Sequence, residues 1–351
     1  MNIVSLFSGC GGLDLGFHQA GFNIIFANEC DQSIWETYEL NHPQTKLDKK
    51  DIRNVLSDDV PECIGIIGGP PCQSWSEAGA GRGIKDNRGQ LFYDYIRIVR
   101  DKQPLFFLAE NVRGILSARH IQAFTNILNQ FREIGYNVSY QLLNANDFDV
   151  PQDRKRVIIV GYHESMKSHF QFPKAINRKL ALKDAIYDLS SIEPNNVKDK
   201  LGNNYHQIPN HEYLDTGYSS IYMSRNRVRM WNEPSFTIQA GGRHAPIHPQ
   251  ASKMIFVEKD KRIFDPNSPK PYRRLSVREC ARIQTFPDSF ILKYKYINHG
   301  YKMIGNAVPV NLAKILAQKI KIDVLSHIQD GNKQSADKLD TPKQITLIFP
   351  D

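Results

Sequence analysis

Residues 2–20 read NIVSLFSGCGGLDLGFHQA, an apolar run followed by a glycine-rich turn and an amphipathic run. The apolar run predicts a buried strand over residues 2–7, and the amphipathic run predicts a helix over residues 13–20. Further strands are predicted over residues 22–27, 64–67, 105–109, 138–142 and 157–160, and helices over residues 33–40, 90–101 and 121–134. This alternation indicates an α/β fold with a parallel sheet covered on both faces, whose ligands bind beyond the carboxyl ends of the strands.

The glycine turn and two acids are the first candidates for a binding site. Gly9, Gly11 and Gly12 would let backbone approach a ligand closely at a helix N-terminus. Glu29 ends the second predicted strand, where an acid commonly binds ribose hydroxyls, and Asp51 follows a third, where it could accept from an adenine amino group. Together they favour a nucleoside-containing cofactor. A sterically required turn and a helix N-terminal acid are the structural alternatives.

A cysteine follows directly on a rigid loop in the sequence GGPPCQSWS, residues 68–76. Glycines and prolines pack poorly, so this setting argues against Cys72 being an inert buried side chain. A thiol attacks as a thiolate once helix N-termini or cations lower its pKa. We therefore interpret Cys72 as a nucleophile and the other four cysteines as structural.

Charged residues at the next two strands complete the candidate site. Glu110 ends a strongly apolar strand, where it could donate a proton or a hydrogen bond to a heterocycle nitrogen. Arg154 and Arg156 are predicted on one strand, so both would point to the same side, polarise a carbonyl and pair with Glu110. A capping acid and a surface ladder of charges are the alternatives.

Composition excludes several classes of protein. The chain has 351 residues, of which 41% are hydrophobic, enough for a substantial core. No run of about 18 apolar residues is present, so no membrane span is expected. The five cysteines form no C-x-x-C pair, which argues against a disulfide scaffold or a metal site and favours a reducing cytoplasm.

The net charge of +8 is unevenly distributed. Residues 1–60 hold four Lys and Arg against nine Asp and Glu, a balance of −5, whereas residues 222–274 hold eleven against four, a balance of +7. A basic surplus concentrated in one segment is typical of a polyanion-binding surface, and a solvated basic face is the alternative.

Several motifs occur in the order found in DNA (cytosine-5) methyltransferases, which the chain resembles over its whole length up to the tail. They are Phe7–Gly16, Glu29, Gly69–Gln73, Glu110–Val112, Gln152–Arg156, Arg278–Gln284 and Gly305–Pro309. Within that family the chain is most similar to bacterial type II modification enzymes that methylate GGCC, through Met223–Arg229 and His248–Ala251.

The resemblance implies a Rossmann-like, S-adenosylmethionine-dependent methyltransferase sheet with a smaller, mostly irregular or β target-recognition domain. The expected boundaries are 1–185 for the catalytic domain, 186–285 for the recognition domain, 286–328 for the return to the catalytic domain and 329–351 for a flexible tail. Residues 310–325 predict an amphipathic helix, and the polar stretch 330–343 predicts a loose tail.

The resemblance also assigns roles in a reaction. Cys72 would attack C6 of a cytosine flipped from the duplex, Glu110 would protonate N3, and Arg156, with Arg154 behind it, would hold the base oxygen. S-adenosylmethionine would be bound by Phe7, Gly9, Gly11, Gly12, Glu29, Asp51, Pro70, Asn306 and Val308.

The basic segment is predicted to read DNA. Arg225, Arg227 and Arg243 suit guanine edges in the major groove. Ser76, Arg82 and Arg88 belong to a predicted loop that closes over DNA. Phosphate contacts are equally expected for Arg229, Lys253, Arg273 and Arg274. Residues 239–246 depart from the loop associated with GGCC readers, which leaves the recognition sequence open.

The expected partners are double-stranded DNA and, by function only, a cognate restriction endonuclease. The protein is expected to be a cytoplasmic, nucleoid-associated bacterial monomer. An RNA cytosine-5 methyltransferase and a catalytically inactive DNA-binding regulator are the alternatives.

Overall fold

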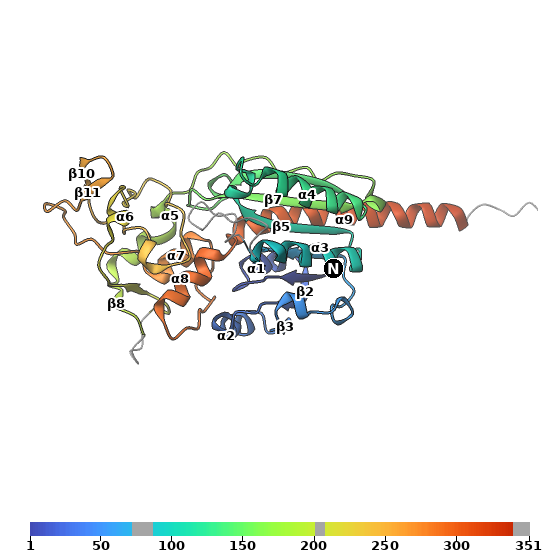
Figure 1. The fold of residues 1–351 in the computed structure, drawn as a ribbon, viewed down its shortest axis with the longest axis horizontal. Helices are drawn as coiled ribbons and strands as arrows, with labels where there is room; N and C mark the ends of the chain where they lie inside the picture. The colour runs from blue at the N-terminus through green and yellow to red at the C-terminus, as the bar shows by residue number, and fades with distance from the viewer. Residues whose placement is uncertain (72–86, 201–207, 340–351) are drawn as a thin grey trace, which may run out of the picture.

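The computed structural model describes residues 1–71, 87–200 and 208–339. Within these residues a seven-stranded sheet has the order β3-β2-β1-β4-β5-β7-β6 (Figure 1). Its strands are β1 (Asn2–Leu6), β2 (Asn23–Asn28), β3 (Lys46–Asp48), β4 (Gly65–Gly68), β5 (Phe106–Val112), β6 (Tyr136–Asn144) and β7 (Lys155–His163). The mixed α/β architecture with a mainly parallel sheet confirms the predicted fold class.

The direction of β7 differs from the prediction. β1 to β5 pair in parallel, but β7 pairs antiparallel with both β5 and β6. The physical reason is the connection: residues 145–154 join β6 to β7 without the crossover helix that a parallel pair requires. The prediction of an all-parallel sheet is therefore wrong at this edge.

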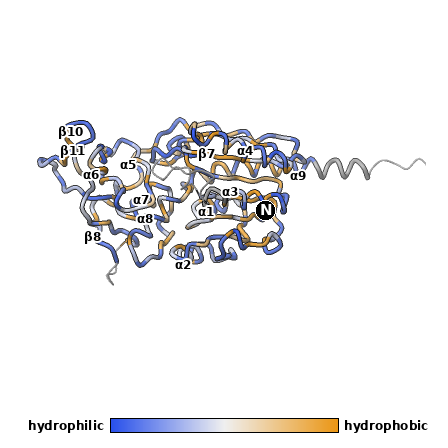
Figure 2. The backbone as a smooth tube through the Cα atoms, in the orientation of Figure 1, coloured by the Kyte–Doolittle hydropathy of each residue, from blue (hydrophilic) through white to orange (hydrophobic). Residues whose placement is uncertain are grey.

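Helices cover both faces of the sheet. One face carries α1 (Gly12–Gln19) and α9 (Val310–Leu339), and the other carries α3 (Asn87–Lys102) and α4 (Ile121–Glu133). Neighbouring strand residues point to opposite faces, so each strand serves two cores. Ile3, Ile67, Phe106 and Ile158 belong to the first core, and Val4, Ile66, Phe107 and Ile159 belong to the second. Figure 2 shows the hydrophobic segments concentrated in this part of the molecule.

The rest of the chain forms a smaller part beside the sheet (Figure 1). Its short elements are α5 (Leu182–Ile186), β8 (Asn195–Val197), β9 (Glu212–Leu214), α6 (Ser220–Met223), β10 (Ile255–Glu258), β11 (Lys261–Ile263), α7 (Val277–Ile283) and α8 (Ile297–Asn306). Tyr222, Val228, Ile247, Ala251 and Met254 form a small core of its own. A larger core joins this part to Cys10, Ile34 and Val310. The two parts therefore share buried surface.

The C-terminal helix is longer than predicted. α9 continues to Leu339 and extends beyond the sheet (Figure 1), whereas the sequence predicts a helix only to Leu325 and a loose tail from Asp330. In the described parts of the chain, no helix combines the length and apolar character needed to cross a bilayer.

α1 and α9 approach so closely that only glycine fits at the contact. A Cβ on Gly16 would lie 2.4 Å from the Ala313 Cβ and 2.7 Å from the Val310 carbonyl oxygen. We expect Gly16→Ala to lower the stability by about 2 kcal/mol through overpacking, despite the better helix propensity of alanine. Gly217→Ala is the matched control, because no atom lies within 4 Å of its added Cβ. Thermal unfolding measures both, and equal melting temperatures would contradict this account.

Candidate active site

The glycine turn lies at the carboxyl end of β1 and faces open space at Gly9, whereas Gly11 and Gly12 are buried against His42 and Val308. Phe7, Gly9 and Gly11 have positive φ of 55°, 55° and 88°, a conformation that glycine adopts without strain. A Cβ on Gly9 would meet no atom within 4 Å. The turn can therefore accept a ligand directly against its backbone.

Glu29 is held at the edge of this space by main-chain groups. Its Oε2 accepts from the Gly9 N–H at 3.0 Å, and its Oε1 accepts from the Asp31 N–H at 2.8 Å. Burial raises the pKa of this carboxyl above its usual value. Each carboxylate oxygen can accept a further hydrogen bond, which suits the paired hydroxyls of a ribose.

The C-terminal return of the chain packs against the same turn. A Cβ on Gly12 would lie 2.6 Å from the Val308 carbonyl oxygen and 2.9 Å from the Phe286 ring. Val308 is buried and Asn306 is exposed at the end of α8. The structure thus brings Gly12 and Val308 together, although almost 300 residues separate them in the sequence, and Asn306 lies two residues before Val308.

Asp51 has a local structural role. It precedes the short 3₁₀ turn Ile52–Asn54, accepts from the Arg53 N–H at 3.0 Å and pairs with the Arg53 guanidinium at 2.6 Å. The Arg53 hydrogen bond lowers the pKa of the Asp51 carboxyl. Its role toward an adenine stays a prediction.

Glu110 and Arg156 form a largely shielded ion pair beside the predicted nucleophile loop. The antiparallel register pairs Val112 with Arg156, which places the arginine diagonally opposite Glu110. The Arg156 Nε lies 2.8 Å from the Glu110 Oε1, and the two side chains are 13% and 10% exposed. The other oxygen, Oε2, lies 3.6 Å from a Cβ built on Gly69. Glu110 therefore borders the Gly69–Pro70 end of the loop.

The loop is also tied to β5. The Asn111 side-chain amide donates to the Pro70 carbonyl at 3.3 Å, and Pro70 is buried. Cys72, Ser76 and Arg82 lie outside the described residues, as does the side chain of Arg88 on α3. Their roles stay predictions.

Arg154 does not project from the strand that carries Arg156. β7 begins only at Lys155, so the expected alternation does not apply to Arg154. Its buried guanidinium donates to the carbonyls of Ile238, Gly305 and Ala307 at 3.0, 2.9 and 2.9 Å. This clamp on backbone is a function that the sequence did not predict.

The predicted base-reading arginines differ in their freedom. Arg225 and Arg243 are exposed. Arg227 donates instead to the carbonyls of Tyr222 and Ile221 at 2.8 and 3.1 Å, and its guanidinium lies 4.8 Å from the centre of the Tyr222 ring. To contact a DNA base, the Arg227 side chain would have to give up its hydrogen bonds to these two carbonyls of α6.

Two predicted phosphate contacts are wrong, because both side chains are buried. Arg273 donates to both oxygens of Glu279 at 2.8 Å, and Arg274 donates to the carbonyls of Leu214, Thr216 and Gly217. Burial acts to raise the pKa of the Glu279 carboxyl, but Arg273 outweighs it and the pKa falls to about 2. The other two residues predicted to contact phosphate form ion pairs, Arg229 with Asp153 and Lys253 with Glu233.

Sequence reasoning also missed two buried glutamines. Gln152 and Gln284 hydrogen-bond to each other at 3.0 Å. Each stands in a motif that was noticed only for its charged residues, and an uncharged amide gives no signal of its own in one sequence.

Comparison with known proteins identifies the family. The family model for C-5 cytosine-specific DNA methylases matches residues 1–322. The chain belongs to this family.

Two relatives and one solved structure show how far the likeness extends. The chain is 59% identical to the type II methyltransferase M.MthTI of Methanothermobacter thermautotrophicus, over 92% of this chain and 98% of that protein. It is 56% identical to M.FnuDI of Fusobacterium nucleatum, over 92% and 94%. A DNA modification methyltransferase encoded within an E. coli prophage shares the fold with a TM-score of 0.70 at 26% identity, covering 92% of this chain and 99% of that one. The protein is therefore a DNA cytosine-5 methyltransferase, and the RNA and inactive-regulator alternatives are disfavoured.

We expect Arg156→Ala to reduce kcat for methyl transfer about 100-fold, because Glu110 loses the group that orients it. The KM for DNA should change far less, since Glu110 and Arg156 are largely shielded. Arg132→Ala on the exposed face of α4 is the control. Steady-state kinetics with tritiated methyl donor measures both, and a native kcat in Arg156→Ala would contradict the orienting role.

Proposed function

We propose that this enzyme methylates C5 of a cytosine flipped out of duplex DNA, with Cys72 as the nucleophile. The observation that carries the proposal is the Glu110–Arg156 pair, which borders the Gly69–Pro70 segment two residues before Cys72. An acid held at this place can donate to the ring nitrogen of a base whose C6 the thiolate attacks. Flipping is required because C6 is inaccessible in a stacked duplex.

The proposed reaction begins with the thiolate of Cys72. The Cys72 thiolate bonds to C6 while Glu110 gives a proton to N3, and the ring becomes an enamine. The enamine C5 then takes the methyl group. Loss of the C5 proton to water re-forms the C5–C6 double bond and expels the thiolate, and N3 returns its proton to Glu110. Arg156 would hold the base oxygen and keep Glu110 oriented throughout.

The residues around the glycine turn fit S-adenosylmethionine. The open space at Gly9 admits a ligand, Glu29 offers acceptors for ribose hydroxyls, Val308 borders the turn, and Asn306 is exposed two residues before it. We infer that Phe7, Gly11, Gly12, Asp51 and Pro70 complete the site. When bound, S-adenosylmethionine supplies a methyl group on a positively charged sulfur, which leaves as a neutral thioether.

The recognition role belongs to the smaller part of the molecule. Arg225 and Arg243 are exposed there and suit guanine edges, with Arg227 as a third reader. We propose a short GC-rich target, GGCC or a relative of it. Because the relatives named above are type II methyltransferases, the modification would protect DNA from a cognate restriction endonuclease in the same cell, where the enzyme acts at the nucleoid.

Bisulfite sequencing of DNA from cells that express the protein tests the target. We expect complete conversion resistance at one cytosine of a short GC-rich site.

Arg243→Ala should lower discrimination between that site and single-substituted sites by about 10- to 100-fold, the value of one bidentate arginine–guanine contact. Unchanged relative affinities would exclude Arg243 as a base reader.

Trapping on duplex DNA that contains 5-fluorocytosine tests the nucleophile, because fluorine at C5 cannot leave as a proton does. The native enzyme should form a covalent complex that resists denaturing electrophoresis, and Cys72→Ala should form none while retaining specific DNA binding. A native enzyme that methylates DNA without being trapped would overturn the mechanism.

Two glycines with positive φ allow a matched test of the cofactor site. Gly9→Ala and Gly135→Ala introduce a Cβ at φ of 55° and 93° without a close contact, so both should cost about 1–2 kcal/mol of stability. Only Gly9→Ala should weaken binding of S-adenosylhomocysteine, by tenfold or more, as measured by calorimetry. Equal affinities would place the cofactor elsewhere.

A further inference from the structure

Gln152 connects the start of β7 with the segment that leads to Arg243. Its side chain is fully buried. The Gln152 Oε1 accepts from the Ile238 N–H at 3.0 Å, and its Nε2 donates to the Gln284 Oε1 at 3.0 Å. Since the Ile238 N–H can only donate, the Gln152 oxygen must face it, and the orientation of the Gln152 amide is fixed.

Gln284 carries the connection onward to the cofactor side. Its Nε2 donates to the Ile304 carbonyl at 2.8 Å and reaches the Ala307 carbonyl at 3.4 Å. These carbonyls belong to the last turn of α8 and the residue after it, where a helix leaves acceptors unpaired. The Gln284 amide therefore has one satisfying orientation as well, and each glutamine enforces the orientation of the other.

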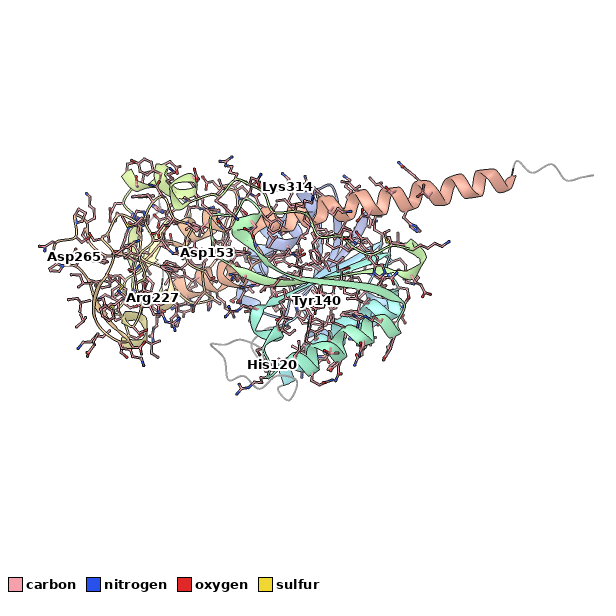
Figure 3. The ribbon with its side chains drawn as sticks, turned by 90° about the horizontal axis from the view of Figure 1, so that it is seen from above. His120, Tyr140, Asp153, Arg227, Asp265 and Lys314 are labelled. Atoms are coloured by element: carbon pink, nitrogen blue, oxygen red, sulfur yellow. The ribbon has the colours of Figure 1, made fainter. Side chains whose placement is uncertain are left out.

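The Arg154 guanidinium also joins the segment at Ile238 to the end of α8, independently of the two glutamine amides. Arg154 donates both to the Ile238 carbonyl and to the carbonyls of Gly305 and Ala307. A Cβ on Gly305 would lie 2.3 Å from the carbonyl carbon of Gln239, so the two backbones touch. Figure 3 shows Asp153, between Gln152 and Arg154, where the sheet meets the smaller part that carries Arg227.

The two segments that Gln152, Gln284 and Arg154 connect have different proposed roles, one in cofactor binding and the other in base reading. Ala307 and Val308 border the cofactor turn at Gly12, whereas residues 239–242 lead to the exposed Arg243. Gly242 is further held by its N–H, which donates to the Asn298 side chain of α8 at 3.2 Å. Because Gly305 packs against the Gln239 backbone and the Gly242 N–H donates to Asn298, a shift of α8 would be passed on to residues 239–243.

We propose that Gln152, Gln284 and Arg154 form a coupling relay, through which occupation of the cofactor site positions the base-reading loop at residues 239–243. The three are positioning residues. The inference rests on the proposed function, because it takes the turn at residues 305–308 as part of the cofactor site and Arg243 as a reader. It adds that cofactor and target sequence bind cooperatively by way of these side chains.

The native, full-length enzyme gives the first test. Saturating S-adenosylhomocysteine, without DNA, should slow amide hydrogen exchange in residues 238–243 as well as near residues 305–308. It should also raise the affinity of the enzyme for its target sequence, relative to a single-substituted sequence, on the order of tenfold. By linkage, the target sequence should raise the affinity for S-adenosylhomocysteine by the same factor. An unchanged exchange rate at residues 238–243 would overturn the proposal.

Matched variants give the second test. Gln152→Met and Gln284→Met keep side-chain length but remove the amides, and Gln122→Met on the exposed face of α4 is the control. The coupling factor is the ratio of S-adenosylhomocysteine affinities measured with and without target DNA. We expect it to fall to within twofold of one in the two relay variants and to stay native in the control. Folded relay variants with native coupling would contradict the inference.

Two further outcomes separate this inference from the proposed function. If Gln284→Met does not fold, Gln152→Met carries the test, because it removes the same hydrogen bond from its other partner and should still uncouple the two sites. If the native enzyme binds no S-adenosylhomocysteine, the cofactor assignment fails and the relay fails with it. If it binds and methylates normally but shows no coupling, only the relay is overturned.

Discussion

The carbonyl oxygens at the end of α8 impose the constraint on which much of the site depends. The last carbonyls of a helix lack their usual intrahelical partners. Here the carbonyls of Gly305 and Ala307, and that of Ile304, which also accepts from the Ala307 N–H, are directed into the protein rather than to solvent. Gln284 and Arg154 satisfy them from two other segments of the chain. Because burial makes an unmade hydrogen bond expensive, these segments must meet at one place, and that place borders the glycine turn.

Close backbone approach is the second device that builds the site. Gly12, Gly16 and Gly305 each stand where an added Cβ would overlap a main-chain or side-chain atom of a distant segment. The N-terminal turn and the C-terminal return can therefore form one wall, although they are far apart in sequence. The smaller part of the molecule joins the same arrangement through a shared core and through Gln152. The proposed cofactor-binding and recognition surfaces consequently share one packed junction.

The charged residues show how far one sequence can predict a site. Glu110 could be placed because an acid near the end of an apolar strand must lie toward the carboxyl edge of the sheet, and the structure pairs it with Arg156 as expected. Arg154, Arg273 and Arg274 could not be assigned in the same way. An arginine that binds backbone carbonyls or a buried acid has the same sequence signature as one that binds a phosphate, since only burial distinguishes them.

The sequence alone determined the strand–helix alternation, the glycine turn, the acids at strand ends and the order of the motifs, because these depend on local periodicity and side-chain chemistry. Only the tertiary structure decided that β7 reverses, that α9 continues to Leu339, and that Gln152, Arg154 and Gln284 converge on the end of α8. The reason is physical: uncharged amides and main-chain carbonyls leave no pattern along the chain, and their partners are selected by burial and distance once the segments are packed.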